Sequence, residues 1–275
     1  MNKMELDNYS VLMSVYYKEN PLFLSQSIES ILNQTKKTND FVIICDGPLT
    51  KELDLVLEKY QQSNQDVINI VRKKKNEGLG LALKLGVTKC KNEIIMRMDS
   101  DDISVPERAE TELLLMNQFD LVGSDIEEFE GEISNRIGKR IVPKDIKGIK
   151  KWLKSRSPFN HPSVMYKKSV ILKAGNYSDC PLREDYLLWI NLLRVTENVC
   201  NIPKVLVYMR SGIEMRIRRG AKAGKESSKR ILKYLLSLHN INHFEYCWIS
   251  FKQSVFYHSP VWLKKIYYKH LLRKQ

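Results

Sequence analysis

The sequence predicts an α/β fold in which a parallel, doubly wound sheet is completed by further strands into a mixed sheet. Two observations lead to this prediction. Short apolar segments alternate four times with segments of helical periodicity before Asp99. Acidic, glycine and aromatic residues stand directly after several of the apolar segments. Because ligands of doubly wound sheets bind beyond the carboxyl ends of the strands, these residues are expected to converge on one crevice.

Each predicted element has a local signal at its start or end. Runs of valine, isoleucine and aromatic residues favour strands, and Asn20-Pro21 and Thr50 are typical helix starts. The turn that begins with Asp46-Gly47 ends the second strand. Strands are therefore predicted over residues 9–16, 40–45, 67–72 and 94–98, helices over 22–33, 50–64 and 81–90, and further strands and turns within 119–142.

Three carboxylates lie within four positions after the fourth strand: Asp99, Asp101 and Asp102. Like charges a few ångströms apart repel each other, and a divalent cation with oxygen ligands commonly relieves that repulsion. A cation held by few carboxylates keeps open positions, which phosphate oxygens of a nucleotide can fill. The cluster therefore predicts a cation and nucleotide site, although a solvated acidic turn is an alternative that the cluster alone leaves open.

The chain also carries a series of motifs in a fixed order from Tyr9 to Arg219. They are residues 14–16 with 27–35, 46–47, 76–83, 97–102 with 106–108, 160–165, 174–177 and 184–189. These motifs resemble those of the family 2 glycosyltransferases, in particular the bacterial enzymes that build capsule, exopolysaccharide and O-antigen repeat units. The resemblance implies the GT-A fold, a Rossmann-like nucleotide-binding mixed sheet flanked by helices.

The resemblance implies that the protein is an inverting glycosyltransferase of the hexosyl type. It would move a sugar from a nucleotide sugar, for which we predict a UDP-sugar, to a hydroxyl of a saccharide acceptor. The leaving diphosphate gains negative charge, and a Mn²⁺ or Mg²⁺ ion held by Asp99, Asp101 and Asp102 would stabilise it. Asp99 would also touch the ribose, and Asp102 could bind the ion in place of Asp101 or support it.

The acceptor hydroxyl must lose a proton to a carboxylate or imidazole within hydrogen-bond reach. The resemblance places this base at Asp185, with Glu184 as its neighbour. The same pair also suits the start of a helix predicted over 186–195, where acidic residues are favoured. The two interpretations are compatible, because that helix end would face the crevice. An inverting transfer needs one displacement and one base, so no covalent nucleophile is predicted.

The predicted donor site gathers residues from several strand ends. Val15 and Tyr16 end the first strand, and Asp46 follows the second, where an aspartate can accept a hydrogen bond from a uracil imide. The other predicted contacts are Gly78, Lys84, Asp99, Arg218 and Arg219, the two arginines as partners of a diphosphate. Tyr16 could instead be a core residue, Asp46 a turn residue, and the arginines part of a solvated basic loop. Lys84 stands where related enzymes commonly have a small amide, which leaves the donor open.

The net charge of +13 resides in the carboxyl-terminal quarter of the chain. From Lys204 onward there are 16 lysines and arginines against 3 acidic residues, whereas the preceding residues are electrically neutral. After a helix predicted over 226–239, aromatic rings are interleaved with basic residues from Phe244 to the end. Such a segment can lie in the interface of an anionic membrane. We therefore predict a GT-A domain over residues 1–215 and a helical, basic and aromatic membrane-associating tail over 216–275.

Two other uses of this tail are conceivable. It could be a terminal helix packed on the catalytic domain, with Trp248 and Trp262 in the core, and this is compatible with membrane binding. Nucleic-acid binding would place basic residues around the crevice, whereas here they are confined to the tail. No nucleic-acid motif occurs either, so we predict no nucleic-acid partner.

The expected location is the cytoplasm, peripheral on the inner face of the bacterial cell membrane, where a lipid-linked acceptor would be found. The 5 cysteines have no paired spacing, and the amino terminus has no signal-peptide pattern. No stretch reaches the roughly 20 apolar residues that a membrane-spanning helix needs.

Two rival functions differ in what they require. A sugar nucleotidyltransferase would need a glycine-rich phosphate loop after the first strand, and residues 15–19 contain no glycine. A non-catalytic, membrane-bound assembly partner could dispense with the carboxylates. This chain retains them at Asp99, Asp101, Asp102 and Asp185.

Overall fold

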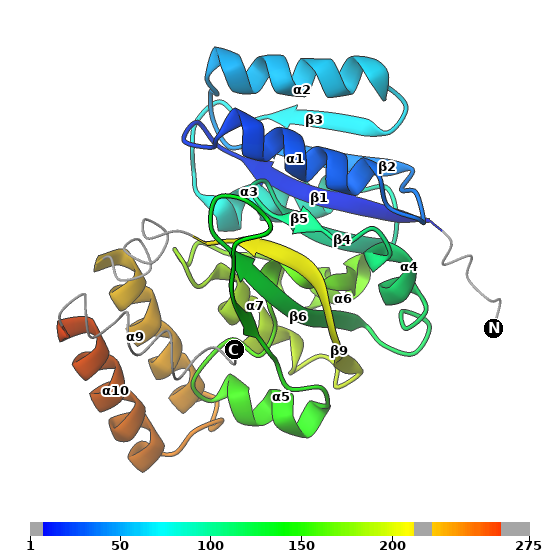
Figure 1. Ribbon diagram of the computed structural model, residues 1–275. Helices are drawn as coiled ribbons and strands as arrows, with labels where there is room; N and C mark the ends of the chain where they lie inside the picture. The colour runs from blue at the N-terminus through cyan, green and yellow to red at the C-terminus, as the bar shows by residue number, and fades with distance from the viewer. Residues whose placement is uncertain (1–7, 212–221, 260–275) are drawn as a thin grey trace.

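The computed structural model describes residues 8–211 and 222–259, and its strands form one mixed sheet (Figure 1). The strands are β1 (Tyr9–Val15), β2 (Asp40–Cys45), β3 (Ile68–Arg72), β4 (Ile94–Asp99), β5 (Ile103–Ser104), β6 (Leu121–Phe129), β7 (Arg136–Arg140), β8 (Met165–Lys167) and β9 (Val199–Arg210). The helices are α1 (Pro21–Leu32), α2 (Lys51–Ser63), α3 (Leu79–Lys89), α4 (Arg108–Leu113), α5 (Ile146–Leu153), α6 (Lys168–Lys173), α7 (Glu184–Leu192), α9 (Lys222–Ser237) and α10 (His243–His258), with a short 3₁₀ helix at His161–Ser163.

The sheet has the order β3-β2-β1-β4-β8-β6-β9-β5, with β7 paired to β6. Neighbouring strands from β3 to β4 are parallel, as the alternation of strands and helices predicts. The sheet becomes mixed at β8, which runs antiparallel to both β4 and β6. The predicted α/β class and the completion of the sheet by residues 119–142 are therefore confirmed.

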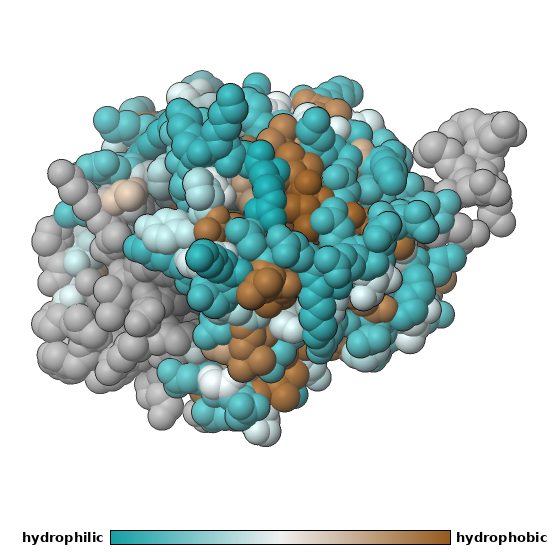
Figure 2. Space-filling view, turned by 90° about the horizontal axis from the view of Figure 1, so that it is seen from above, coloured by the Kyte–Doolittle hydropathy of each residue, from teal (hydrophilic) through white to brown (hydrophobic). Residues whose placement is uncertain are grey.

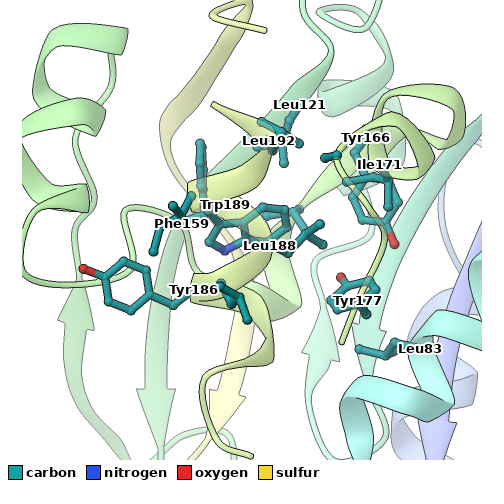
Figure 3. Packing of buried hydrophobic residues seen from close by; sticks show 14 of the residues in the cluster. Leu83, Leu121, Phe159, Tyr166, Ile171, Tyr177, Tyr186, Leu188, Trp189 and Leu192 are labelled. Carbon is teal, nitrogen blue, oxygen red and sulfur yellow. The ribbon is translucent and has the colours of Figure 1, made fainter. Parts of the chain in front are cut away.

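Two hydrophobic clusters cover opposite faces of the sheet. Successive side chains of a strand point to opposite faces, and in β1 Val11 and Met13 join the cluster with α1, α2 and α4, whereas Leu12 joins the one with α3 and α7. Figure 3 shows part of the second cluster, in which Trp189 of α7 packs against Phe159. The layers thus fix α3 and α7 on the same side of the sheet, next to its carboxyl edge.

Helix starts follow their capping residues. Asn20 accepts a hydrogen bond from the Leu22 N–H at 2.9 Å, and Thr50 accepts one from the Leu53 N–H at 3.4 Å. The predicted helix over 81–90 begins earlier, at Leu79, because Gly78 with its positive φ of 92° serves as the N-cap. The predicted helix over 186–195 covers Glu184–Leu192 instead, so both acidic residues of the motif lie in its first turn.

The carboxyl-terminal helices α9 and α10 lie side by side at one end of the molecule (Figure 1). The helix predicted over 226–239 covers Lys222–Ser237, and its Ile231, Leu232 and Leu235 are buried in the cluster with α7. Trp248 of α10 is 52% exposed, so its suggested place in the core is wrong. Trp262 and the predicted boundary at 215/216 lie outside the described residues, and the domain division stays a prediction.

The face seen in Figure 2 is mostly hydrophilic, with an elongated apolar strip near its middle and smaller apolar patches around it. Within residues 8–211 and 222–259, no helix is long and apolar enough to cross a membrane.

Candidate active site

The three predicted carboxylates meet at the carboxyl end of β4. Asp99, Asp101 and Asp102 each offer an oxygen, and these oxygens lie within 4.8 Å of one another. Burial, together with repulsion from Asp99, raises the pKa of Asp101 to about 7. Burial and repulsion from Asp101 raise the pKa of Asp102 well above its usual value. The protein therefore concentrates negative charge at a point where water cannot fully solvate it.

The donor atoms of this cluster fit a divalent cation. Asp102 is almost completely buried, and its Oδ1 accepts a hydrogen bond from the Arg210 N–H at 2.8 Å. Its Oδ2 is buried and has no hydrogen-bond partner among the described residues. A buried carboxylate oxygen without a partner is destabilising unless a cation or a proton reaches it. Carboxylate oxygens are also the ligands that Mn²⁺ and Mg²⁺ prefer.

Arg97 of β4 contacts the acidic cluster, and the sequence analysis did not single it out. It is 1% exposed, and its Nη2 donates to Asp99 Oδ1. Burial lowers the pKa of Arg97, but the nearby acidic groups, Asp99 above all, together raise it by a larger amount. The net shift of its pKa is therefore upward. The residue thus remains a cation that offsets part of the charge of the cluster and fixes one oxygen of Asp99.

Glu184 and Asp185 lie at the start of α7. Ser157 Oγ donates to Asp185 Oδ2 at 3.2 Å. Glu184 is 7% exposed, and burial followed by repulsion from Asp185 raises its pKa to about 7. Its pKa also responds to the charges of Arg97 and Asp99, so the start of α7 lies within electrostatic reach of the acidic cluster.

Gly80 is a second site feature that the sequence argument did not single out. A Cβ atom at this position would lie 2.3 Å from the Ser178 C=O oxygen and 3.1 Å from Glu184 Cβ. Only glycine therefore lets α3 approach the start of α7 this closely. A signal was present in the sequence, because Gly80 is the second glycine of the motif at residues 76–83.

Asp46 makes a dense set of contacts inside the protein. Its Oδ1 accepts from Lys73 Nζ at 2.6 Å and from the Glu77 N–H at 3.0 Å, and its Oδ2 accepts from the Gly78 N–H at 2.8 Å. The carboxylate thus shapes the loop before α3, in keeping with the alternative of a turn residue. The predicted hydrogen bond from a uracil imide to Asp46 stays a prediction. It would have to go to a carboxylate oxygen that already accepts a hydrogen bond within the protein.

The other residues predicted to contact the nucleotide-sugar donor come from β1, α3 and the segment after β9. Val15 is fully buried, Tyr16 is half-buried at the end of β1, and Lys84 is exposed on α3. Arg218 and Arg219 lie outside the described residues. The donor contacts at these positions stay predictions.

His161 belongs to one of the sequence motifs. Its Nε2 lies 3.0 Å from the Tyr177 hydroxyl, and its ring lies edge-on to Trp189 with centroids 6.1 Å apart. Burial, with a further contribution from the charge of Arg97, lowers the pKa of His161 well below its usual value. The ring is therefore neutral at physiological pH and is held by aromatic neighbours.

The buried position of Glu184 gives a prediction about stability. Its pKa of about 7 in the folded state lies above the usual 4.5, so the folded state binds its proton more tightly than the unfolded state does. The stabilisation is complete below pH 4.5 and is lost as the pH rises to about 7. The Glu184→Gln variant stays neutral and should gain up to roughly 3 kcal/mol relative to the parent over that range.

Urea unfolding of both proteins at about pH 4.5 and at about pH 8 measures this difference. Glu107→Gln is a suitable control, because the Glu107 side chain is 44% exposed at the start of α4. A stability difference between Glu184→Gln and the parent that does not change with pH would contradict the prediction.

Comparison with known proteins identifies the family. Residues 10–173 match the model of glycosyl transferase family 2. The chain is 39% identical over 218 residues to the UDP-Gal:alpha-D-GlcNAc-diphosphoundecaprenol beta-1,3-galactosyltransferase of Escherichia coli, covering 77% of this chain and 77% of that protein. It is 35% identical over 210 residues to the amylovoran biosynthesis glycosyltransferase AmsE of Erwinia amylovora, covering 75% of this chain and 77% of the relative.

Solved structures show the same fold. TarS of S. aureus in complex with UDP-GlcNAc has a TM-score of 0.66 at 16% identity, covering 91% of this chain and 72% of that chain. The mannosyltransferase PcManGT from Pyrobaculum calidifontis in complex with GDP-Man and Mn²⁺ has a TM-score of 0.61 at 14% identity, covering 94% and 78%. These similarities confirm the predicted GT-A fold. Since the family model matches more than half of its residues, the chain belongs to glycosyl transferase family 2.

Proposed function

We propose that this protein is a metal-dependent, inverting hexosyltransferase that moves a sugar from a UDP-sugar to a hydroxyl of a lipid-linked saccharide during synthesis of a bacterial surface polysaccharide. The observation that carries the proposal is the clustering of three carboxylates at the end of β4, within electrostatic reach of the start of α7. The names of the relatives support the substrate classes, because one uses UDP-Gal and a saccharide on diphosphoundecaprenol and another acts in amylovoran biosynthesis.

The acidic cluster would bind the nucleotide-sugar donor through a metal ion. Asp99, Asp101 and Asp102 would hold Mn²⁺ or Mg²⁺, which when bound offsets the charge that develops on the leaving diphosphate. Arg97 orients Asp99 by donating to its Oδ1, and its buried charge limits the repulsion among the three carboxylates. The Arg97 guanidinium would not bind the diphosphate directly, because the side chain is almost fully buried.

The start of α7 would supply the base. Ser157 holds Oδ2 of Asp185, so Oδ1 is the oxygen that would take the proton of the acceptor hydroxyl. The raised pKa of Glu184 keeps this neighbour mostly protonated below about pH 7, which limits the negative charge around the base. No observation favours a nucleotidyltransferase or a non-catalytic partner.

The proposal is tested with the full chain, a panel of UDP-, GDP- and dTDP-sugars, Mn²⁺, and a synthetic saccharide on a polyprenyl diphosphate. We expect transfer from one UDP-sugar, with the anomeric configuration of the product opposite to that of the donor by NMR. Retention of configuration would contradict the inverting mechanism. In a parallel assay with UTP and sugar 1-phosphates in place of the nucleotide sugars, release of pyrophosphate with formation of a nucleotide sugar would instead identify a nucleotidyltransferase.

The exposed face of α10 supports association with the cytoplasmic face of an anionic membrane. Phe244, Trp248, Phe251 and Val255 recur at helical spacing and are each more than half exposed. A shallow groove between α5 and α10 has lysines as half of its eight lining residues, and Glu245, which pairs with Lys154, also lines it. The lysines are Lys150, Lys151, Lys154 and Lys252. Exposed aromatic rings flanked by lysines are the combination that binds the interface of an anionic bilayer.

Replacing Trp248 and Phe251 together by serine should reduce binding of the full chain to vesicles that contain phosphatidylglycerol, by roughly tenfold or more, because both rings would lose their burial in the interface. Co-sedimentation measures this, and Leu55→Ser is the control, since Leu55 is 64% exposed on α2, away from α10. Equal vesicle binding by the double variant and the parent would contradict the proposed face. Transfer to a short, soluble acceptor should be unchanged in the double variant.

A further inference from the structure

Arg210, the last residue of β9, connects the acidic cluster to distant parts of the chain. Its backbone N–H donates to Asp102 Oδ1 at 2.8 Å, and its Nε donates to the Asp101 C=O at 3.0 Å. The residue is 7% exposed. One residue therefore contacts both adjacent acidic residues, although it follows them by more than a hundred positions in the sequence.

The rest of the guanidinium is held by uncharged groups. Nη1 donates to the Gly131 C=O at 2.7 Å, and Nη2 donates to Gln26 Oε1 at 2.7 Å. The guanidinium also lies 3.7 Å from the ring centroid of Phe23 and 4.6 Å from that of Phe129. The side chain is thus fixed on all sides by α1, by the segment after β6 and by the acidic segment.

The charge of Arg210 is directed at the cluster. Its side-chain hydrogen bonds go to two backbone carbonyls and an amide oxygen, and within residues 8–211 and 222–259 no carboxylate forms an ion pair with the guanidinium. Its electrostatic interactions are with Asp101 and Asp102 first, and then with Glu132 and Glu19. A fixed positive charge near two carboxylates reduces their mutual repulsion, and the guanidinium donates to none of the carboxylate oxygens that a cation needs.

We propose that Arg210 is a positioning residue for the divalent cation, because its side chain fixes the backbone at Asp101 and its charge holds Asp101 and Asp102 together in a binding arrangement. The inference rests on the proposed function only in that the acidic cluster binds a divalent cation. It assigns to Arg210 a role in binding the cation, distinct from a role in stability alone.

The test is the affinity of the full chain for Mn²⁺ in the presence of UDP, measured from the EPR signal of free Mn²⁺. Arg210→Met keeps much of the contact with the two phenylalanine rings but removes the charge and the hydrogen bonds, and it should weaken Mn²⁺ binding by tenfold to a hundredfold. Arg210→Lys keeps the charge without the planar fork and should restore part of the affinity. Arg136→Met is the matched control, since Arg136 also stacks on a ring, that of Tyr208, at 3.8 Å, but does not contact the acidic segment.

Gln26→Met is a milder variant that removes only the acceptor of Nη2, and it keeps the test decisive if the Arg210 variants do not fold. It should weaken Mn²⁺ binding several-fold with little change in melting temperature. If Arg210→Met, or Gln26→Met in its place, binds Mn²⁺ like the parent while only the melting temperature falls, Arg210 is structural and the inference is wrong. If the parent itself binds no Mn²⁺, the metal dependence of the proposed function is wrong. If only the parent-like binding of the variants is observed, the role of Arg210 is wrong and the metal dependence stands.

Discussion

Replacing Asp101 by alanine should abolish most of the transfer activity and the metal-dependent affinity for UDP. Asp101 is one of three carboxylates whose oxygens lie within 4.8 Å of one another, and burial, followed by repulsion from Asp99, raises its pKa to about 7. A bound cation contributes several kcal/mol to stabilising the leaving diphosphate, so the rate should fall by roughly 10³-fold. Calorimetric titration of UDP with Mn²⁺ and then with a chelator, together with transfer rates, measures both effects.

The control for this prediction is Glu107→Ala. Glu107 follows the cluster closely in sequence, but its partner is Lys204 at 3.5 Å and it is not part of the group of three. The Glu107→Ala variant should transfer sugar and bind UDP like the parent. Equal affinity of the parent for UDP with Mn²⁺ and with chelator would show that the acidic cluster does not hold a cation for the nucleotide.

Removing Asp101 should also relieve repulsion, so the loss of activity need not be accompanied by a loss of stability. The raised pKa values of Asp101 and Asp102 show that the cluster is unfavourable in the folded protein when its members are ionised. Asp101→Ala should therefore unfold at the same temperature as the parent or higher at neutral pH in the presence of chelator. A variant that is inactive yet fully stable separates a functional role from a structural one.

The features that the sequence predicts well are those that depend on neighbouring residues. The four parallel strands, the caps at Asn20 and Thr50, and the placing of three carboxylates at the end of β4 all follow from short segments. The convergence on one edge follows from topology alone, because parallel strands end on the same side of a sheet.

The features that the sequence argument missed are contacts between distant segments. Arg97 donates to Asp99 within one strand, yet its charge also acts on Glu184 of α7, and Arg210 reaches Asp101 from the last strand. The three hydrogen bonds to Asp46 come from a loop about 30 residues further along the chain, so a turn residue and a ligand contact look alike in the sequence. Trp248 is a similar case, since an aromatic residue on a helix can face a core or the solvent.

Replacing Asp185 by asparagine should lower the transfer rate by roughly 10² to 10⁴, the usual contribution of general base catalysis, while affinity for UDP is retained. Asparagine keeps the shape of the side chain and its place beside Ser157 Oγ, but it cannot take the acceptor proton. The comparison of kcat with the calorimetric Kd for UDP separates the loss of chemistry from a loss of donor binding. Asp179→Asn, an exposed acidic residue shortly before α7, is the control and should behave like the parent. A near-parental rate for Asp185→Asn would mean that the base lies elsewhere, and Glu184 and His161, which is neutral because burial lowers its pKa, would then be replaced in turn.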